Sequence, residues 1–373
     1  MQITAAVAHG VKAPLTLETV EIEDPRPDEV LVRVVATGVC HTDMAMRDQE
    51  LPVPPPAVLG HEGAGIVVRV GAGVTRVAPG DRVVMSFNSC GACPSCHDHI
   101  PAYCHDFFGR NFSGRRADGS SGLSWPGPGE GRVLGGNVFG QSSFATHALC
   151  PERNVVKVPA TAPLEILGPL GCGVLTGAGA VMNALRVARG QSLAVFGTGA
   201  VGLSAVMAAR VMGAASIIAI DLVEARLDLA RELGATHVFN PGRTSVVDGI
   251  MALTGGMGVD YALDTTARLA VVGDAVRCLA PRGVCGLVGA MPFGQILPVD
   301  GGHLMSGGRS VRGIVEGDAD PHQFIPALID LYLAGQFPFD RLITFYPLAE
   351  INQAIHDAEA GRTVKPVLRM PGW

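Results

Sequence analysis

Three observations predict an α/β plus β fold for this chain of 373 residues. Short apolar runs alternate with helix-like stretches between residues 190 and 290, which is typical of a doubly wound parallel sheet. A glycine-rich turn joins the first of these runs to the first helix-like stretch. Residues 1–173 instead contain short strands separated by turn signals, and this pattern favours a partly open β-barrel.

The α/β region is expected to follow a regular order of strands and helices. Strands are predicted at 192–196, 216–220, 237–239, 259–263 and 283–288, and helices at 203–212, 224–233, 246–253 and 270–279. The β region has strands at 30–35, 65–70 and 81–85, and the tail adds helices near 323–333 and 348–359 and a strand at 366–370. We therefore expect domains at 1–173 and 174–313, with 314–373 returning to complete the first domain.

The composition excludes several classes of protein. With 48% hydrophobic residues and a net charge of −6, the chain is not disordered. A pI near 6.0 gives no general attraction to nucleic acid or anionic lipid. The uncharged stretches 166–185 and 192–209 are long enough to suggest membrane spans, but their glycine and polar content favours a buried α/β core. The N-terminus lacks a signal-peptide pattern, so we expect a cytoplasmic protein.

Four of the nine cysteines are closely spaced, within a predicted lobe at residues 88–105. An odd number of cysteines without an export signal argues against a disulfide framework. Cys90, Cys93, Cys96 and Cys104 have a spacing that completes a closed tetrahedral zinc shell. An iron–sulfur cluster or a group of redox thiols is the alternative, although the ferredoxin spacing does not continue after Cys96. The pattern favours a structural zinc ion.

A second set of metal-binding candidates is scattered along the chain. Cys40, His61 and Cys172 each have glycine nearby, which permits close approach of the backbone to an ion. Two cysteines and one histidine are a donor set that leaves the fourth position of a catalytic zinc open. Each residue alone is a weak signal, and spacing does not establish that the three converge.

A glycine motif opens the α/β region. Gly197, Gly199 and Gly202 follow the strand at 192–196 and precede a helix, and Asp221 ends the next strand 19 residues after Gly202. This context predicts a Rossmann dinucleotide site, with the pyrophosphate at the helix N-terminus. The Asp221 carboxylate would accept hydrogen bonds from the ribose of NAD. It would repel the 2′-phosphate of NADP by about 4 kcal/mol for charges about 4 Å apart.

These motifs together resemble the zinc-dependent medium-chain alcohol dehydrogenase family, in the family's order and over essentially the whole chain. The resemblance implies a GroES-like catalytic domain, with Cys40, His61 and Cys172 as ligands of the catalytic zinc. It implies two zinc ions in each chain, NAD as cofactor, and an alcohol and its aldehyde as substrate and product. It also implies a homo-oligomer, for which the apolar segment Val284–Pro298 is a candidate subunit contact.

The resemblance further implies roles for neighbouring residues. Glu62 would lie beside the metal, Thr42 would relay the alcohol proton, and Asp43 would orient His61. The implied cofactor contacts are His41 at a phosphate, Arg226 at the adenosine ribose, Lys365 at the pyrophosphate, and Thr176, Val201, Val288 and Ala290 at the nicotinamide.

The chain departs from the family pattern at Ala45, where a relay histidine often stands. His41 would then serve both as the phosphate contact and as the proton exit, or water would complete the relay.

Residues 109–120 and 139–148 resemble the aryl-alcohol dehydrogenase branch, which implies a primary aromatic or allylic alcohol. Candidates for the apolar pocket wall are Phe87, Phe112, Phe139 and Met291. Geraniol-type alcohols are close competitors. A glutathione-dependent formaldehyde dehydrogenase would need basic groups, for which Arg110, Arg115 and Arg116 are available. A non-catalytic protein that binds NAD or zinc on the same fold is the alternative of a different class.

Overall fold

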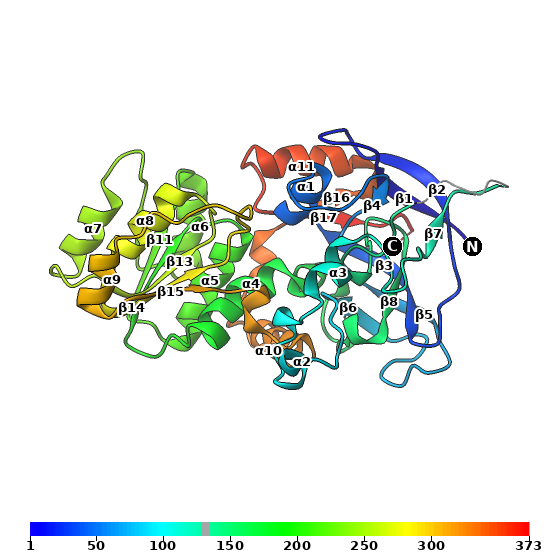
Figure 1. The fold of residues 1–373 in the computed structure, drawn as a ribbon, viewed down its shortest axis with the longest axis horizontal. Helices are drawn as coiled ribbons and strands as arrows, with labels where there is room; N and C mark the ends of the chain where they lie inside the picture. Colours follow the sequence, from blue (N-terminus) through cyan, green and yellow to red (C-terminus); the bar gives the residue numbers. More distant parts are fainter. Residues whose placement is uncertain (128–133, 373) are drawn as a thin grey trace. The chain divides into compact units, whose positions relative to one another are not determined.

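The computed structural model describes residues 1–127 and 134–372, and the chain folds into two compact units (Figure 1). The first unit contains residues 1–172, 320–330 and those from 343 onward, and the second contains 173–319 and 331–342. The observed division after Cys172 lies beside the expected one. Residues 314–319 and 331–342, which were expected in the return segment, belong to the second unit. Residues 128–133, between the segments 109–120 and 139–148 that resemble the aryl-alcohol branch, lie outside the described residues.

The first unit is built on two sheets. The larger has the order β16-β17-β3-β5-β6-β9, with β8 also paired to β3. These strands are β16 (Ile343–Pro347), β17 (Lys365–Arg369), β3 (Glu29–Gly38), β5 (Glu62–Val70), β6 (Arg82–Met85), β9 (Val155–Lys157) and β8 (His147–Pro151). The smaller sheet, β4-β1-β2-β7, consists of β4 (Ala57–Val58), β1 (Gln2–Ala8), β2 (Thr16–Ile22) and β7 (Leu123–Ser124).

The centre of the larger sheet joins both ends of the chain. β3 is rich in valine and buried at nearly every position, as expected for a strand covered on both faces. β17, near the C-terminus, pairs antiparallel with β3, so the red and blue strands lie side by side in Figure 1. The helices of this unit include α1 (His41–Arg47), α2 (Pro94–His97), α3 (Phe107–Phe112) and α11 (Ile351–Glu359), together with most of α10 (Pro321–Leu333).

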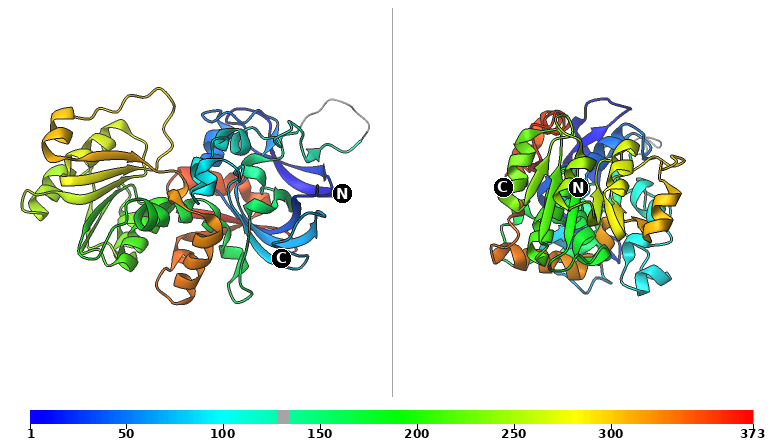
Figure 2. Two further views of the ribbon diagram at one scale, coloured as in Figure 1. Left: turned by 60° about the horizontal axis from the view of Figure 1, so that its bottom comes forward. Right: turned by 90° about the vertical axis from the view of Figure 1, so that its left-hand side faces the viewer.

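The second unit contains the predicted doubly wound sheet. Its strands pair in parallel in the order β12-β11-β10-β13-β14-β15, and helices lie on both faces (Figure 2, right). The strands are β10 (Ser192–Phe196), β11 (Ser216–Ile220), β12 (His237–Phe239), β13 (Val259–Asp264), β14 (Leu279–Leu287) and β15 (Ser310–Gly313). The helices are α4 (Gly173–Gly179), α5 (Ala200–Met212), α6 (Glu224–Leu233), α7 (Val246–Leu253), α8 (Leu269–Arg277) and α9 (Gly301–Gly307). This strand order places a ligand site beyond the carboxyl ends of β10 and β13, where the winding reverses.

The predicted fold is confirmed. Elements that the sequence did not predict include α4, α9 and β15 in the second unit and β1, β2, β8, β9 and β16 in the first. The first uncharged stretch contains the short turn Gly168–Gly171, α4 and the π-helical segment Ala180–Ala184, and the second contains β10 and most of α5. No helix among the described residues is long and apolar enough to cross a membrane. The expected subunit-contact segment exposes Phe293 and Ile296, at 84% and 87% of their surfaces.

Candidate active site

The first unit gathers the scattered metal-ligand candidates at one place. The ligand atoms of Cys40, His61, Glu62 and Cys172 all lie within 4.8 Å of one another. Cys40 directly precedes α1, His61 directly precedes β5, and Cys172 follows a short turn at Gly168–Gly171. Zinc bonds of about 2.3 Å to sulfur and about 2.1 Å to nitrogen place tetrahedral ligand atoms roughly 3.5–3.8 Å apart, so the cluster fits one ion.

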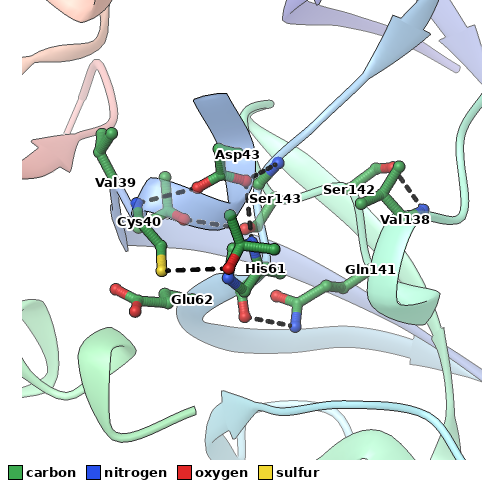
Figure 3. A network of polar contacts seen from close by, with 12 residues as sticks. Val39, Cys40, Asp43, His61, Glu62, Val138, Gln141, Ser142 and Ser143 are labelled. Carbon is green, nitrogen blue, oxygen red and sulfur yellow. Dashed lines mark hydrogen bonds and ion pairs between the residues drawn. The ribbon is translucent and has the colours of Figure 1, made fainter. Parts of the chain in front are cut away.

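His61 is oriented for metal binding by a carboxylate behind it. Asp43 Oδ1 lies 2.8 Å from His61 Nδ1 and accepts the Gly60 amide at 3.1 Å, while Oδ2 accepts the Cys40 amide at 2.9 Å (Figure 3). His61 Nε2 is buried and has no hydrogen-bond partner among the described residues. A buried nitrogen without a partner costs free energy, and a zinc ion between the thiols would satisfy it. This arrangement is the one predicted for Asp43.

The two thiols also favour a cation. A hydrogen bond from Cys172 lowers the pKa of Cys40 well below its ordinary value, although burial opposes this shift. The positive charges of Lys365 and His61 act in the same direction as the hydrogen bond. Thiolate is the form of cysteine that binds metal.

Glu62 and Lys365 form a fully buried ion pair next to this cluster. Lys365 Nζ lies 2.9 Å from both carboxylate oxygens of Glu62 and donates to Val39 O at 3.2 Å. The two side chains are 0% and 3% exposed. Burial alone would lower the pKa of Lys365, but the Glu62 charge raises it above its ordinary value. The resemblance assigned this amine to the cofactor pyrophosphate, whereas the structure places it where Glu62 would otherwise be an unpaired buried charge.

The expected proton-relay residues lie at the start of α1. Thr42 Oγ1 is 3.8 Å from Cys40 Sγ, and the Thr42 side chain is half-buried. His41 is exposed at the first position of the helix. Ala45 is buried at 6% exposure, so its position offers no group that carries a proton.

The four closely spaced cysteines form a second cluster in the first unit. Their sulfur atoms all lie within 4.8 Å of one another. Backbone amides point at these sulfurs: Cys90 Sγ accepts from the Ala92 and Cys93 amides at 3.4 and 3.3 Å. The Ala92 amide lowers the pKa of Cys90 to about 6. The donor set, four sulfurs around one point, fits a tetrahedral zinc ion.

The glycine motif in the second unit has the geometry of a dinucleotide turn. Gly197 has a φ of +91°, which only glycine adopts freely. A Cβ on Gly202 would lie 1.9 Å from Gly197 O, so this glycine permits close packing. A Cβ on Gly199 would meet nothing within 4 Å, and Gly199 caps α5. The open backbone before this helix N-terminus fits a pyrophosphate.

Asp221 follows β11 and ties this turn together. Its Oδ2 accepts from Thr198 N at 2.7 Å and Thr198 Oγ1 at 2.9 Å, and its Oδ1 accepts from Val223 N at 2.9 Å. Arg226 follows on α6 with a buried Nε that has no hydrogen-bond partner within the described parts of the chain. Asp221 thus bonds directly to the glycine turn, and Arg226 lies in the same unit, five residues further along the chain.

The remaining nicotinamide candidates also belong to the second unit. Thr176 on α4 donates to Glu316 at 3.2 Å, and both side chains are 8% exposed. Val201 is half-buried in the first turn of α5. Val288 and Ala290 follow β14, half-buried and exposed respectively. Their contacts with a cofactor stay predictions.

Aromatic side chains lie on one side of the metal-ligand candidate His61. The Phe139 ring stacks on the His61 imidazole, with centroids 4.5 Å apart and planes 27° apart. Phe112 meets Phe139 edge-on at 5.1 Å, and Phe87 lies 5.9 Å from Phe107. Of the predicted pocket residues, Met291 alone lies in the second unit.

Sequence reasoning missed several residues that shape these sites. Thr198 could have been noticed, since a hydroxyl inside the glycine motif can reach the acid that ends the next strand. Glu316 and Gln141 had no comparable signal, because their partners lie far away in sequence: Thr176 for Glu316, and His61 and Gly63 for Gln141.

Comparisons with known proteins agree with this geometry. Residues 26–160 match the family described as "Alcohol dehydrogenase GroES-like domain", and residues 200–334 match "Zinc-binding dehydrogenase". A geraniol dehydrogenase of Castellaniella defragrans is 49% identical over 366 residues, which cover 98% of this chain and 96% of that protein.

Two solved structures are similar over nearly their whole length. An alcohol dehydrogenase zinc-binding domain protein from Burkholderia ambifaria is 54% identical, with a TM-score of 0.96 over 100% of this chain and 99% of that one. A benzyl alcohol dehydrogenase from Acinetobacter calcoaceticus is 47% identical, with a TM-score of 0.95 over 99% of each chain. The chain therefore belongs to the zinc-dependent alcohol dehydrogenase family, with zinc and NAD as its cofactors.

Proposed function

We propose that this alcohol dehydrogenase oxidises primary alcohols whose hydroxyl-bearing carbon lies next to a π-system, either an aromatic ring or a carbon–carbon double bond. The similar proteins from Acinetobacter and Castellaniella are named for benzyl alcohol and geraniol, at 47% and 49% identity. These two alcohols differ in shape, but both carry the hydroxymethyl group beside a π-bond. Their shared chemistry supports the substrate class.

The observation that carries this proposal is the pair of phenylalanine rings at His61. Phe139 covers one face of the imidazole, and Phe112 meets Phe139 edge-on. Both rings are buried, at 3% and 7% exposure, so they give the metal-ligand cluster an apolar aromatic border. Flat π-systems pack favourably against such rings in offset or edge-to-face contacts.

The first unit would hold the catalytic zinc through Cys40, His61 and Cys172. Bound there, zinc supplies Lewis acidity, which makes an alcohol hydroxyl a much stronger acid. Asp43 fixes the imidazole so that Nε2 faces the thiols. The Thr42 hydroxyl, beside Cys40 Sγ, accepts the alcohol proton and passes it onward.

The alcohol loses one proton and one hydride when it becomes the aldehyde. NAD, when bound in the second unit, would accept the hydride from the carbinol carbon, and the proton leaves to solvent. His41 is the proton exit in this scheme, because it is exposed next to Thr42 and Ala45 offers no alternative. The turn Gly197–Gly202 and Asp221 bind the dinucleotide, and the Asp221 carboxylate selects NAD over NADP.

A second zinc ion would occupy the cluster of Cys90, Cys93, Cys96 and Cys104. Four thiolates leave no open position, so this ion would be structural. Amide-to-sulfur contacts at Cys90, which stabilise a thiolate, support this assignment over a set of redox thiols.

Among the alternatives, the Castellaniella relative supports a geraniol-type substrate as well as an aryl one. A glutathione conjugate finds less support, because two of its three candidate basic groups already have acidic partners. Arg116 binds Glu29 at 2.6 Å and Glu23 at 2.8 Å, and Arg110 lies 2.9 Å from Asp106.

The test is a set of matched alcohols with NAD. Benzyl alcohol is compared with cyclohexylmethanol, and geraniol with its dihydro analogue citronellol; cinnamyl alcohol, ethanol and S-hydroxymethylglutathione complete the panel. We expect each conjugated alcohol to exceed its saturated partner about tenfold or more in kcat/KM, which corresponds to about 1.4 kcal/mol of transition-state binding. Equal values within both pairs would refute the proposed substrate class, and preference for the glutathione adduct would favour the formaldehyde branch.

A further inference from the structure

The segment that carries His61 is held along its length by one turn. We call residues Val58–Gly63 the His61 segment and residues Val138–Phe144 the clasp turn. Hydrogen bonds join the clasp turn to Val58, Leu59, Gly60, His61 and Gly63 of the His61 segment. They are Ser142 Oγ to Val58 O (2.6 Å), Phe144 N to Leu59 O (3.0 Å), Ser143 N to Gly60 O (2.9 Å), Gln141 Nε2 to His61 O (2.9 Å) and Gly63 N to Gln141 Oε1 (3.1 Å).

Gln141 makes the contacts nearest to the metal ligand. Its Nε2 donates to His61 O (Figure 3) and its Oε1 accepts from Gly63 N, so the amide binds the backbone on both sides of Glu62. Nε2 also lies 3.2 Å from Ser86 O, directly after β6. The side chain is 1% exposed, so water does not replace these bonds. Gln141 therefore fixes the backbone from which the imidazole projects.

The backbone of the clasp turn is strained where it meets His61. Phe139 and Ser142 have φ angles of 51° and 49°, in the left-handed region that non-glycine residues rarely adopt. Asn154 Nδ2 donates to Phe139 O at 2.9 Å and helps to hold this conformation. The strained turn places the Phe139 ring on the imidazole face while Gln141 holds the His61 backbone.

Two glycines allow the segments to approach this closely. A Cβ on Gly60 would lie 2.5 Å from Phe144 N, and a Cβ on Gly63 would lie 2.8 Å from Ser143 Cβ. Gly60 also has a φ of +93°. The glycines on either side of His61 and Glu62 thus make room for the clasp turn as well as for an ion.

We propose that Gln141 is a positioning residue for the catalytic metal, with Phe139 as its partner. Asp43 fixes Nδ1 at one end of the imidazole, the Phe139 ring limits its rotation, and Gln141 fixes its backbone origin. Together these contacts direct Nε2 toward the two thiols. Loss of Gln141 leaves two buried backbone carbonyls and one amide without this partner, so the segment shifts and the nitrogen loses its alignment.

The experiment compares Gln141→Met with a matched control. Asn111 is also a fully buried amide with three backbone hydrogen bonds, to Asn88 N, Asn88 O and Phe107 O, and none of these three bonds reaches the His61 segment. Outer partners of metal ligands change metal affinity by about 10–100-fold. We expect Gln141→Met to speed release of one zinc equivalent to a chelator by about this factor. It should also shift the visible spectrum of the cobalt-substituted enzyme. Asn111→Leu should lower the melting temperature and change neither readout for the site at His61.

A second variant keeps the test decisive if Gln141→Met does not fold. Phe139→Leu removes the stacked ring and keeps the backbone bonds of the clasp turn, so we expect a shifted cobalt spectrum with a smaller change in zinc release. Variants that lose thermal stability but keep the wild-type release rate and cobalt spectrum would overturn the proposal, since the turn would then be only structural. Neither readout depends on which alcohol is the substrate, so failure here is distinct from failure of the proposed substrate class.

Discussion

Replacing Lys365 by Met would leave the Glu62 carboxylate buried without a partner. The two groups are 2.9 Å apart, and their side chains are 3% and 0% exposed, so neither water nor salt screens them. Two unit charges at this distance attract by about 6 kcal/mol at an effective dielectric constant of about 20. Removing one partner of a buried pair typically costs about 3–5 kcal/mol, because the remaining charge is uncompensated.

The same reasoning predicts that removing both charges costs much less. We expect Lys365→Met to destabilise the first unit by about 3–5 kcal/mol, which lowers its melting temperature by roughly 6–20 °C for a unit of this size. The double variant Glu62→Gln/Lys365→Met should recover most of that loss, since no buried charge remains. The exposed pair Lys157–Asp81 is the control, and Lys157→Met should cost less than about 1 kcal/mol.

The wild type, Lys365→Met, Glu62→Gln and the double variant form a double-mutant cycle. Calorimetry and urea unfolding of these four zinc-loaded proteins give the interaction energy of the Glu62–Lys365 pair. Lys365→Met with a stability within about 1 kcal/mol of the wild type would refute the reasoning, because the charge would then be solvated or neutral. A double variant no more stable than Lys365→Met would refute it as well, since the loss would come from packing and not from charge.

Two further predictions concern the cofactor. Asp221→Ala should lower the preference for NAD over NADP by up to about a thousandfold, the factor that corresponds to about 4 kcal/mol of charge repulsion; kcat/KM for both cofactors measures this, and a wild type that uses them equally would contradict it. His41→Gln should raise the Kd of NAD about two- to fivefold, as expected for loss of one favourable contact near a phosphate. It should also lower kcat in a way that added imidazole restores; unchanged values of both would exclude His41 from either role.

The second unit was predictable because its structure follows local patterns. The strands and helices from Ser192 to Leu287 have the expected order and nearly the expected bounds, since parallel strands buried on both faces are apolar throughout. The glycine motif indicated the dinucleotide turn because its glycines meet local requirements: Gly197 has a positive φ, and Gly202 packs directly against Gly197 O. β15 was missed because its four residues, at the edge of the sheet, are only partly buried and carry no apolar pattern.

The residues of the metal-ligand cluster were predictable, but the buried partner of Glu62 was not. Cys40, His61 and Cys172 were weak signals by residue type, and the glycines near them together with the family resemblance singled them out. The resemblance assigned Lys365 to the pyrophosphate, and the sequence around this lysine carries no sign of a buried partner. Its pairing with Glu62 depends on β17 lying beside β3, a long-range contact that no local pattern encodes.

The placement of β17 at the centre of the larger sheet also bears on how the protein is made. Cys40, His61 and Cys172 are synthesised before the sheet of the second unit, but the strand that carries the counter-charge for Glu62 is synthesised after it. A nascent chain therefore completes the sheet of the second unit, from β10 to β15, before its metal-binding half can close. Loss of β17 by proteolysis would leave Cys40, His61 and Cys172 in the chain but would remove the lysine that neutralises the buried Glu62 carboxylate beside them.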